Sequence, residues 1–226
     1  MMSALGKLGA SGALTAVAVL VSLASLALVV FDHPPDENSP EPGFARDMSV
    51  HHAQAVEMAQ IAQEKTDDPE IDNLASDMAL TQQGQIGQMQ GWLSVWGLPI
   101  SGSNERMQWM GMEVEGRMPG MASAEELNEL RNASGEEAEE IFLRLMIPHH
   151  EAAIPMANAS TERSDNEAVT SLAEAIISAQ KAEIQIMRNM LEQRGVQPPE
   201  DGKESMEGME MQSSASSTFR QEASNA

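Results

Sequence analysis

Apolar residues recur at helical spacing through most of the middle of the chain. The first such stretch runs from Phe44 to about Lys65, where a Thr-Asp-Asp-Pro sequence ending at Pro69 breaks the pattern and starts a second helix. This second helix extends to Trp96 and ends at Gly97. No segment alternates polar and apolar residues as a half-buried strand would. The pattern therefore predicts an all-α fold.

The same pattern returns at a constant offset of 98 residues. In the second copy, Ser164 to Glu167 fits a capping box and Gly195 ends the last helix. Each copy reads as a helical hairpin, and two hairpins make a four-helix bundle. Ser123 to Glu126 is expected to cap a short helix in the connection between them. Aligned identities include Phe44/Phe142, Met48/Met146, His51/His149, His52/His150, Ala55/Ala153, Met58/Met156, Gln82/Gln180, Ile86/Ile184 and Gly97/Gly195.

The two ends of the chain differ from this middle part. From Gly9 to Phe31 the residues are almost all apolar, which is enough to span a bilayer and predicts an uncleaved signal anchor or a cleaved signal peptide. Lys7 before the run and acidic residues after it favour an N-terminus on the cytoplasmic side of the membrane. The rest of the chain is then expected in the periplasm or at the cell surface, or secreted if the signal is cleaved. The predicted parts are a membrane or signal helix (1–31), an acidic Pro-rich linker (32–43), the duplicated bundle (44–198) and a disordered tail (199–226). Within the bundle they are repeat 1 (44–99), the crossover (100–134) and repeat 2 (135–198).

The amino-acid composition argues against several classes of function and of binding site. With 13 Lys plus Arg against 35 Asp plus Glu, the net charge of −22 argues against binding to nucleic acid. The absence of Cys excludes disulfides, thiolate zinc sites, iron–sulfur clusters and Cys nucleophiles. The 18 Met residues are the unusual feature of this chain.

Four of the five histidines form two His-His pairs, one on the first helix of each repeat. At helical spacing, each pair shares one face with two methionines, and this face is expected to point into the bundle. If the hairpins pack with pseudo-twofold symmetry, the two faces meet and form a cluster in the core. Its candidate metal ligands are Met48, His51, His52, Met58, Met146, His149, His150 and Met156.

The chemistry of this set favours copper. A di-iron bundle would carry Glu-x-x-His, but Met48 and Met146 stand where the Glu would be, which gives Met-x-x-His-His. Thioethers with imidazoles suit Cu(I), whereas Cu(II) would use the imidazoles and zinc fits less well. The alternative is that the methionines only pack the core and the histidines are buried polar residues.

Two further segments are rich in methionine and lie in polar, Glu-rich sequence, where we expect little core to fill. They predict secondary Cu(I) or Ag(I) capture, and the alternatives are low-complexity sequence or a flexible partner-binding surface. The residues are Met107, Met110, Met112, Met118 and Met121 in the crossover, and Met206, Met209 and Met211 in the tail.

Pro148 and Pro155 fall inside the first helix of repeat 2 and should kink or loosen it. Val50 and Glu57 stand at the equivalent places in repeat 1, so the two halves of any site should differ. The sequence contains no recognisable catalytic triad and no phosphate-binding loop, which favours a non-enzymatic role.

The segments FARDMSVHHAQAVEMAQ and FLRLMIPHHEAAIPMAN resemble domain-of-unknown-function family 305. The resemblance extends from Phe44 to Gly195 and implies a ferritin-like four-helix bundle and an exported location. For CopM-like members it also implies copper binding in copper tolerance. By motif match, the implied ligands are Met48, His51, His52, Met58 and their equivalents in repeat 2.

The sequence thus predicts an exported copper-binding protein, tethered to the membrane by its N-terminal helix, that buffers or delivers Cu(I), with a copper-handling protein as its partner. A ferritin-like metal-dependent oxidoreductase using the same cluster is the first alternative. A metal-free structural or interaction bundle is the second. The oligomeric state stays open.

Overall fold

The computed structural model describes residues 34–102, 106–112, 114 and 116–200. From Asp36 onward, the described residues belong to one compact unit. The predicted signal helix and most of the predicted tail lie outside the described residues. Within the part that is described, no helix is long and apolar enough to cross a membrane.

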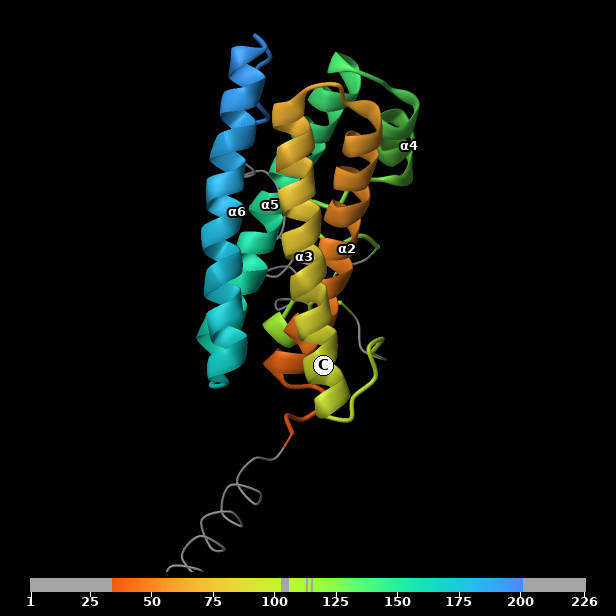
Figure 1. Ribbon diagram of the computed structural model, residues 1–226. Coiled ribbons are helices and arrows are strands. Elements are labelled where there is room, and N and C mark those ends of the chain that lie inside the picture. Colours follow the sequence, from red (N-terminus) through yellow and green to blue (C-terminus); the bar gives the residue numbers. More distant parts are fainter. Residues whose placement is uncertain (1–33, 103–105, 113, 115, 201–226) are drawn as a thin grey trace, which may run out of the picture. The chain divides into compact units, whose positions relative to one another are not determined.

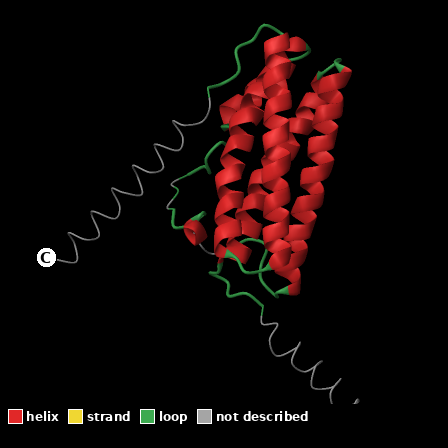
Figure 2. Cartoon of the chain, turned by 90° about the vertical axis from the view of Figure 1, so that its left-hand side faces the viewer, coloured by secondary structure: helices red, strands yellow, loops and turns green. Residues whose placement is uncertain are grey.

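The described residues form helices and no strands, as predicted (Figures 1 and 2). Four long helices carry the structure, with a short helix and a 3₁₀ turn in the crossover. Their bounds are α2 (Pro40–Lys65), α3 (Pro69–Val95), η1 (Gln108–Met110), α4 (Ala124–Asn132), α5 (Glu136–Arg163) and α6 (Glu167–Gln193).

The long helices pair as two hairpins, α2 with α3 and α5 with α6 (Figure 1). The hairpins meet mainly through α2 and α5, which are the first helices of the two repeats. From the crossover, α4 and η1 both pack against these same two helices. The seam between α2 and α5 is therefore the centre of the described unit.

The sequence signals for helix ends hold at most positions. Asp68 caps α3 by accepting a hydrogen bond from the Glu70 amide, and Pro69 takes the first turn. Gly97 and Gly195 adopt φ values of 70° and 73°, so each helix ends with a left-handed residue that glycine tolerates without strain. Ser123 forms the predicted capping box at α4.

Two expectations about helix limits need correction. α2 begins at Pro40, inside the predicted linker. The N-cap of α6 is Asn166, whose side chain accepts from the Ala168 and Val169 amides, whereas Ser164 accepts from the Asn166 amide. Pro148 and Pro155 lie within one continuous α5, so neither proline ends the helix, and the predicted kink stays a prediction.

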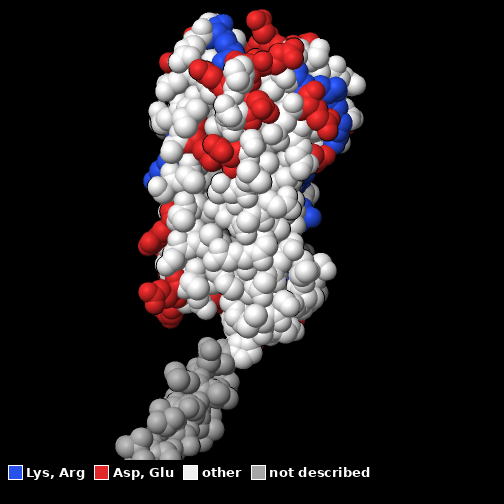
Figure 3. All heavy atoms as spheres, in the orientation of Figure 1, with Lys and Arg blue, Asp and Glu red and all other residues white. Residues whose placement is uncertain are grey.

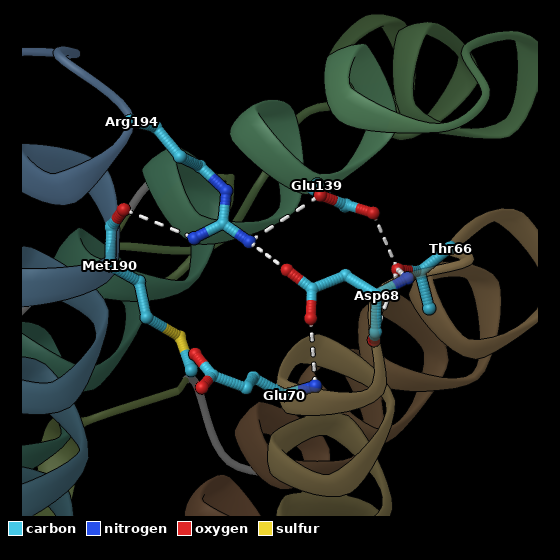
Figure 4. Close-up of polar contacts among 6 residues, drawn as sticks. All are labelled: Thr66, Asp68, Glu70, Glu139, Met190 and Arg194. Carbon is cyan, nitrogen blue, oxygen red and sulfur yellow. Dashed lines mark hydrogen bonds and ion pairs between the residues drawn. The ribbon is translucent and has the colours of Figure 1, made fainter.

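Equivalent polar contacts tie the two hairpins together. Thr66 Oγ1 donates to Glu139 Oε1 at 2.6 Å, and Ser164 Oγ donates to Glu41 Oε1 at 2.7 Å. These two pairs are related by the offset of the repeat. At the Thr66 end, Arg194 joins Asp68 and Glu139 in ion pairs (Figure 4).

Charge is unevenly spread over the helices. The sequence has no Asp, Glu, Lys or Arg from Met78 to Asn104. The view in Figure 3 accordingly contains a broad uncharged area over the C-terminal half of α3, with acidic side chains gathered elsewhere. The equivalent stretch of α6 carries Lys181, Glu183 and Arg188, so the two hairpins present different outer faces.

Candidate metal centre

The two predicted His-His pairs come together at the seam between α2 and α5. His51 and His149 stack with ring centroids 3.8 Å apart and planes inclined by 37°. His51, His52 and His150 are fully buried and His149 is 1% exposed. The prediction that both pairs point into the core is therefore confirmed.

His52 and His150 each contact a polar side chain from the second helix of their own hairpin. Nε2 of His52 lies 2.8 Å from Oε1 of Gln85 on α3, and Nε2 of His150 lies 2.7 Å from Oε2 of Glu183 on α6. Gln85 and Glu183 occupy equivalent positions in the two repeats. We call His52 and His150 the outer histidines, and each is oriented by the second helix of its own hairpin.

Several imidazole nitrogens have no hydrogen-bond partner among the described residues. They are Nδ1 of His51, His52 and His150, together with both nitrogens of His149. Nε2 of His51 lies 3.4 Å from the Pro119 carbonyl oxygen. Buried polar atoms without partners are rare in folded proteins and call for an explanation such as a ligand.

Burial keeps the rings of His51, His52 and His149 neutral. It lowers the pKa of His51 to about 4 and that of His52 to about 3. The pKa of His149 also falls well below its usual value, because of burial and then because of repulsion from His51 and His150. A neutral imidazole with a free lone pair is the form that binds metals.

The four predicted methionine ligands are completely buried, in two separate hydrophobic clusters. Met48 and Met156 lie in the cluster that contains Phe44, and Met58 and Met146 lie in the one that contains Phe142. Each cluster therefore combines one methionine from each repeat. That these thioethers bind a metal stays a prediction.

The crossover lies directly against the histidines. Gly120 has φ 72°, and a Cβ built there would stand 2.5 Å from the Pro148 carbonyl oxygen and 3.1 Å from the His149 Cα. Gln54 holds the same segment from α2, donating to the Ala122 carbonyl at 3.0 Å and accepting from its amide at 2.7 Å. The crossover thus covers the seam at the level of the histidine pair.

The expectation that the crossover methionines have little core to fill was wrong. Met107 is 2% exposed and Met118 is 1% exposed, and both belong to the hydrophobic cluster around Phe44. The remaining three, Met110, Met112 and Met121, are partly buried against it. Because the crossover folds back onto α2 and α5, its polar sequence neighbours do not prevent burial. Met206, Met209 and Met211 lie outside the described residues.

Two polar residues of the centre were not found from the sequence. Gln85 and Glu183 differ between the repeats and lie on the second helices, so a search for identical residues passes over them. Gln82 and Gln180, one turn earlier on α3 and α6, are identical and buried, and both carry side-chain atoms without partners in the described structure. In the described ranges, no three His, Asp or Glu side chains form a group that could hold a metal ion.

The model of the DUF305 family, a domain of unknown function, matches residues 41–191 and again 156–225. The chain belongs to the DUF305 family. A DUF305 crystal structure from Streptomyces coelicolor, of a protein provisionally described as secreted, is 43% identical and covers 73% of this chain and 99% of its own, with a TM-score of 0.70.

Other solved structures extend this DUF305 comparison. A DUF305 fragment from Deinococcus radiodurans is 34% identical over 68% of this chain and 96% of its own, with a TM-score of 0.58. CopM in its Cu(I)-bound form is 27% identical over 68% of this chain and 96% of its own, with a TM-score of 0.55. CopM structures with Cu(II) and with Ag are similar as well. A search of curated proteins finds no significant match.

Proposed function

We propose that this chain is an exported copper-binding protein that holds Cu(I) at the seam between α2 and α5, for copper buffering, delivery or tolerance. The main observation in its support is the set of buried imidazole nitrogens, contributed by both repeats, that have no hydrogen-bond partner among the described residues. Neutral nitrogens of this kind are costly to bury without a partner, and a soft cation would supply one. The solved complexes of CopM, a relative at 27% identity, with Cu(I), Cu(II) and Ag support the same proposal.

The proposed ligands are drawn from His51, His52, His149 and His150, with Met48, Met58, Met146 and Met156 as thioether donors on either side. Cu(I) accepts few ligands, so it does not require three imidazoles already gathered around one point. Cu(II) and zinc are weaker candidates, because both favour three or more nitrogen or oxygen ligands around one point, and the described residues contain no such group. The metal is cargo in this proposal.

We further propose a ferritin-like four-helix bundle located outside the cytoplasm and tethered by the segment at 1–31. The similarity to a DUF305 protein described as secreted supports the location. Met118 directly precedes Pro119, whose carbonyl faces His51, and Met121 follows two residues later, so the crossover is suited to pass an ion to the seam. The tail methionines at 206, 209 and 211 are proposed as a low-affinity capture segment.

A metal-free bundle is the second candidate function. It is favoured by one observation, that no group of three His, Asp or Glu side chains in the described residues is arranged for a metal. A ferritin-like oxidoreductase would require the same centre to turn over Cu(I) with oxygen. No observation on the described residues favours that reaction.

A Cu(I) titration of the full chain in mild detergent, against a chromophoric competitor, tests the proposal. We compare the wild type with a protein in which His51, His52, His149 and His150 are changed to Ala, and with His51→Gln/His149→Gln, which keeps polar side chains if the first variant unfolds. His33→Ala, a change of the fifth histidine, is the matched control. We expect loss of tight binding in both core variants and none in the control.

The same samples separate the rival functions. Oxygen consumption during Cu(I) addition would favour the oxidoreductase. The copper proposal would be overturned in favour of the metal-free bundle if the wild-type protein took no Cu(I) from the competitor and its melting temperature did not change on addition of copper.

A further inference from the structure

The two outer histidines of the seam are held in the same way by residues of unequal charge. The His52–Gln85 and His150–Glu183 contacts each link residues 33 positions apart, and they are related by the offset of the repeat. In both cases the ring uses Nε2. The pattern is therefore a property of the duplicated unit and recurs in both hairpins.

These contacts decide which nitrogen is left for a ligand. A carboxylate only accepts hydrogen bonds, so the Nε2 of His150 must carry the hydrogen that Glu183 accepts. The Gln85 Oε1 receives the Nε2–H of His52 in the same geometry. Nδ1 of each ring is then the nitrogen that remains, and in both rings it is buried without a partner.

The partners differ in charge, although their side chains are nearly the same size. Gln85 is a neutral amide, whereas Glu183 is a carboxylate whose side chain is 18% exposed. A carboxylate behind a ligating imidazole raises the basicity of the ligand and compensates the charge of a bound cation. The imidazole of His150 should thus be a better donor than that of His52.

We propose that Gln85 and Glu183 are positioning residues that turn Nδ1 of His52 and His150 toward the seam, and that Glu183 makes the repeat 2 half of the centre the stronger Cu(I) ligand. This inference rests on the proposed copper function. It assigns the two halves different affinities, which the repeated His-His motif alone does not.

The first test uses the metal-free full chain in mild detergent and needs no copper. Long-range ¹H–¹⁵N spectra of the imidazoles report which ring nitrogen carries hydrogen. We expect His52 and His150 to carry it on Nε2 in the wild type, and Glu183→Gln to preserve that state because its amide oxygen still accepts. Hydrogen on Nδ1 of His150, with Nε2 bare, would overturn the assigned orientation.

The second test is a Cu(I) competition with two reciprocal variants. Glu183→Gln removes the carboxylate and should weaken binding roughly 10-fold, and Gln85→Glu adds one and should strengthen binding by a similar factor. The matched controls change a charge at exposed positions of the same helices: Glu174→Gln on α6 and Gln83→Glu on α3. A purely structural hydrogen bond would not change affinity in opposite directions in the two variants.

The outcomes separate the inference from the function on which it rests. Tight wild-type binding with both variants equal to their controls would overturn the roles of Gln85 and Glu183 and leave the copper function standing. No wild-type binding would overturn both. Opposite shifts in the two variants, absent from the controls, would support the unequal halves.

Discussion

His51 and His149 are equivalent residues of the two repeats, and their rings stack on one another with centroids 3.8 Å apart. Contact between equivalent residues is what pseudo-twofold packing of the two hairpins predicts. The methionines follow the same pattern, because the cluster with Met48 and Met156 and the cluster with Met146 and Met58 contain equivalent residues of the two repeats. The histidine centre is thus where the two halves of the duplicated chain meet.

The first prediction concerns acid. The folded-state pKa of His51 is about 4, below the ordinary value of 6.5, so the unfolded chain binds the proton more readily. The stability that this neutral ring contributes is complete above pH 6.5 and is lost as the pH falls toward 4. Compared with its value above pH 6.5, the free energy of unfolding at about pH 5 should be lower by about 2 kcal/mol because of His51 alone. This follows from about 1.4 kcal/mol per pH unit.

Urea unfolding at several pH values measures this dependence, with His51→Gln as the comparison. The variant should lose less stability than the wild type between pH 6.5 and pH 5. Asp47 works in the opposite direction, because burial raises its pKa above 3.8, but it acts nearer to that value. Equal slopes for the two proteins would contradict the prediction.

The second prediction concerns the crossover. Gly120→Ala should lower the free energy of unfolding by about 2–4 kcal/mol, because the residue has φ 72° and its Cβ would overlap the Pro148 carbonyl oxygen and the Ala152 Cβ, both at 2.5 Å. Gly116→Ala is the control, since Gly116 has φ 89° with no atom within 4 Å of the added Cβ. It should cost only about 1–2 kcal/mol.

Hydrogen exchange of residues 116–122 shows whether the crossover is displaced. We expect faster exchange in Gly120→Ala than in Gly116→Ala, because only the former pushes the segment away from His149. Equal effects of the two substitutions would mean that the close approach at Gly120 does not hold the crossover on the seam.

The sequence predicted the helices well because their ends depend on local chemistry. Pro69, Gly97 and Gly195 act within a single turn, so a short sequence pattern is enough to place them. The predicted N-cap at Ser164 was wrong because Asn166, two residues later, caps the helix instead. The Ser164 hydroxyl donates a hydrogen bond to Glu41 of the other hairpin. The sequence gives no measure of that long-range contact.

The candidate site was predicted in part. The duplication placed both His-His pairs on inward faces, and burial of His51, His52, His149 and His150 followed. Gln85 could not be paired with His52 from the sequence, because the contact depends on how α3 packs on α2. The burial of the crossover methionines likewise depends on tertiary packing, since their sequence neighbours are polar.

The third prediction concerns the end of the unit in Figure 4. Glu139 accepts from Thr66 and also pairs with Arg194 at 3.5 Å, whereas its equivalent Glu41 has Trp96 in place of that arginine. Because Ser39 Oγ also donates to Glu41 at 2.6 Å, the comparison is made in a Ser39→Ala background, where Glu139→Gln should lose about 1 kcal/mol more stability than Glu41→Gln. When Arg194→Met is added to this background the two substitutions should cost the same, and a persisting difference would show that the arginine is not its source.

The last prediction concerns two buried glutamines. Nε2 and Oε1 of Gln82 have no hydrogen-bond partner among the described residues. Gln82 is 2% exposed, and its equivalent Gln180 is 3% exposed. An unpaired buried amide costs about 1–3 kcal/mol, and Met fills a similar volume without that cost. Gln82→Met should thus raise the free energy of unfolding of the metal-free protein by about 1 kcal/mol. Gln83→Met, at an exposed position of the same helix, is the control and should change little. A loss of stability in Gln82→Met alone would mean that the amide already has a partner in solution, such as a buried water molecule.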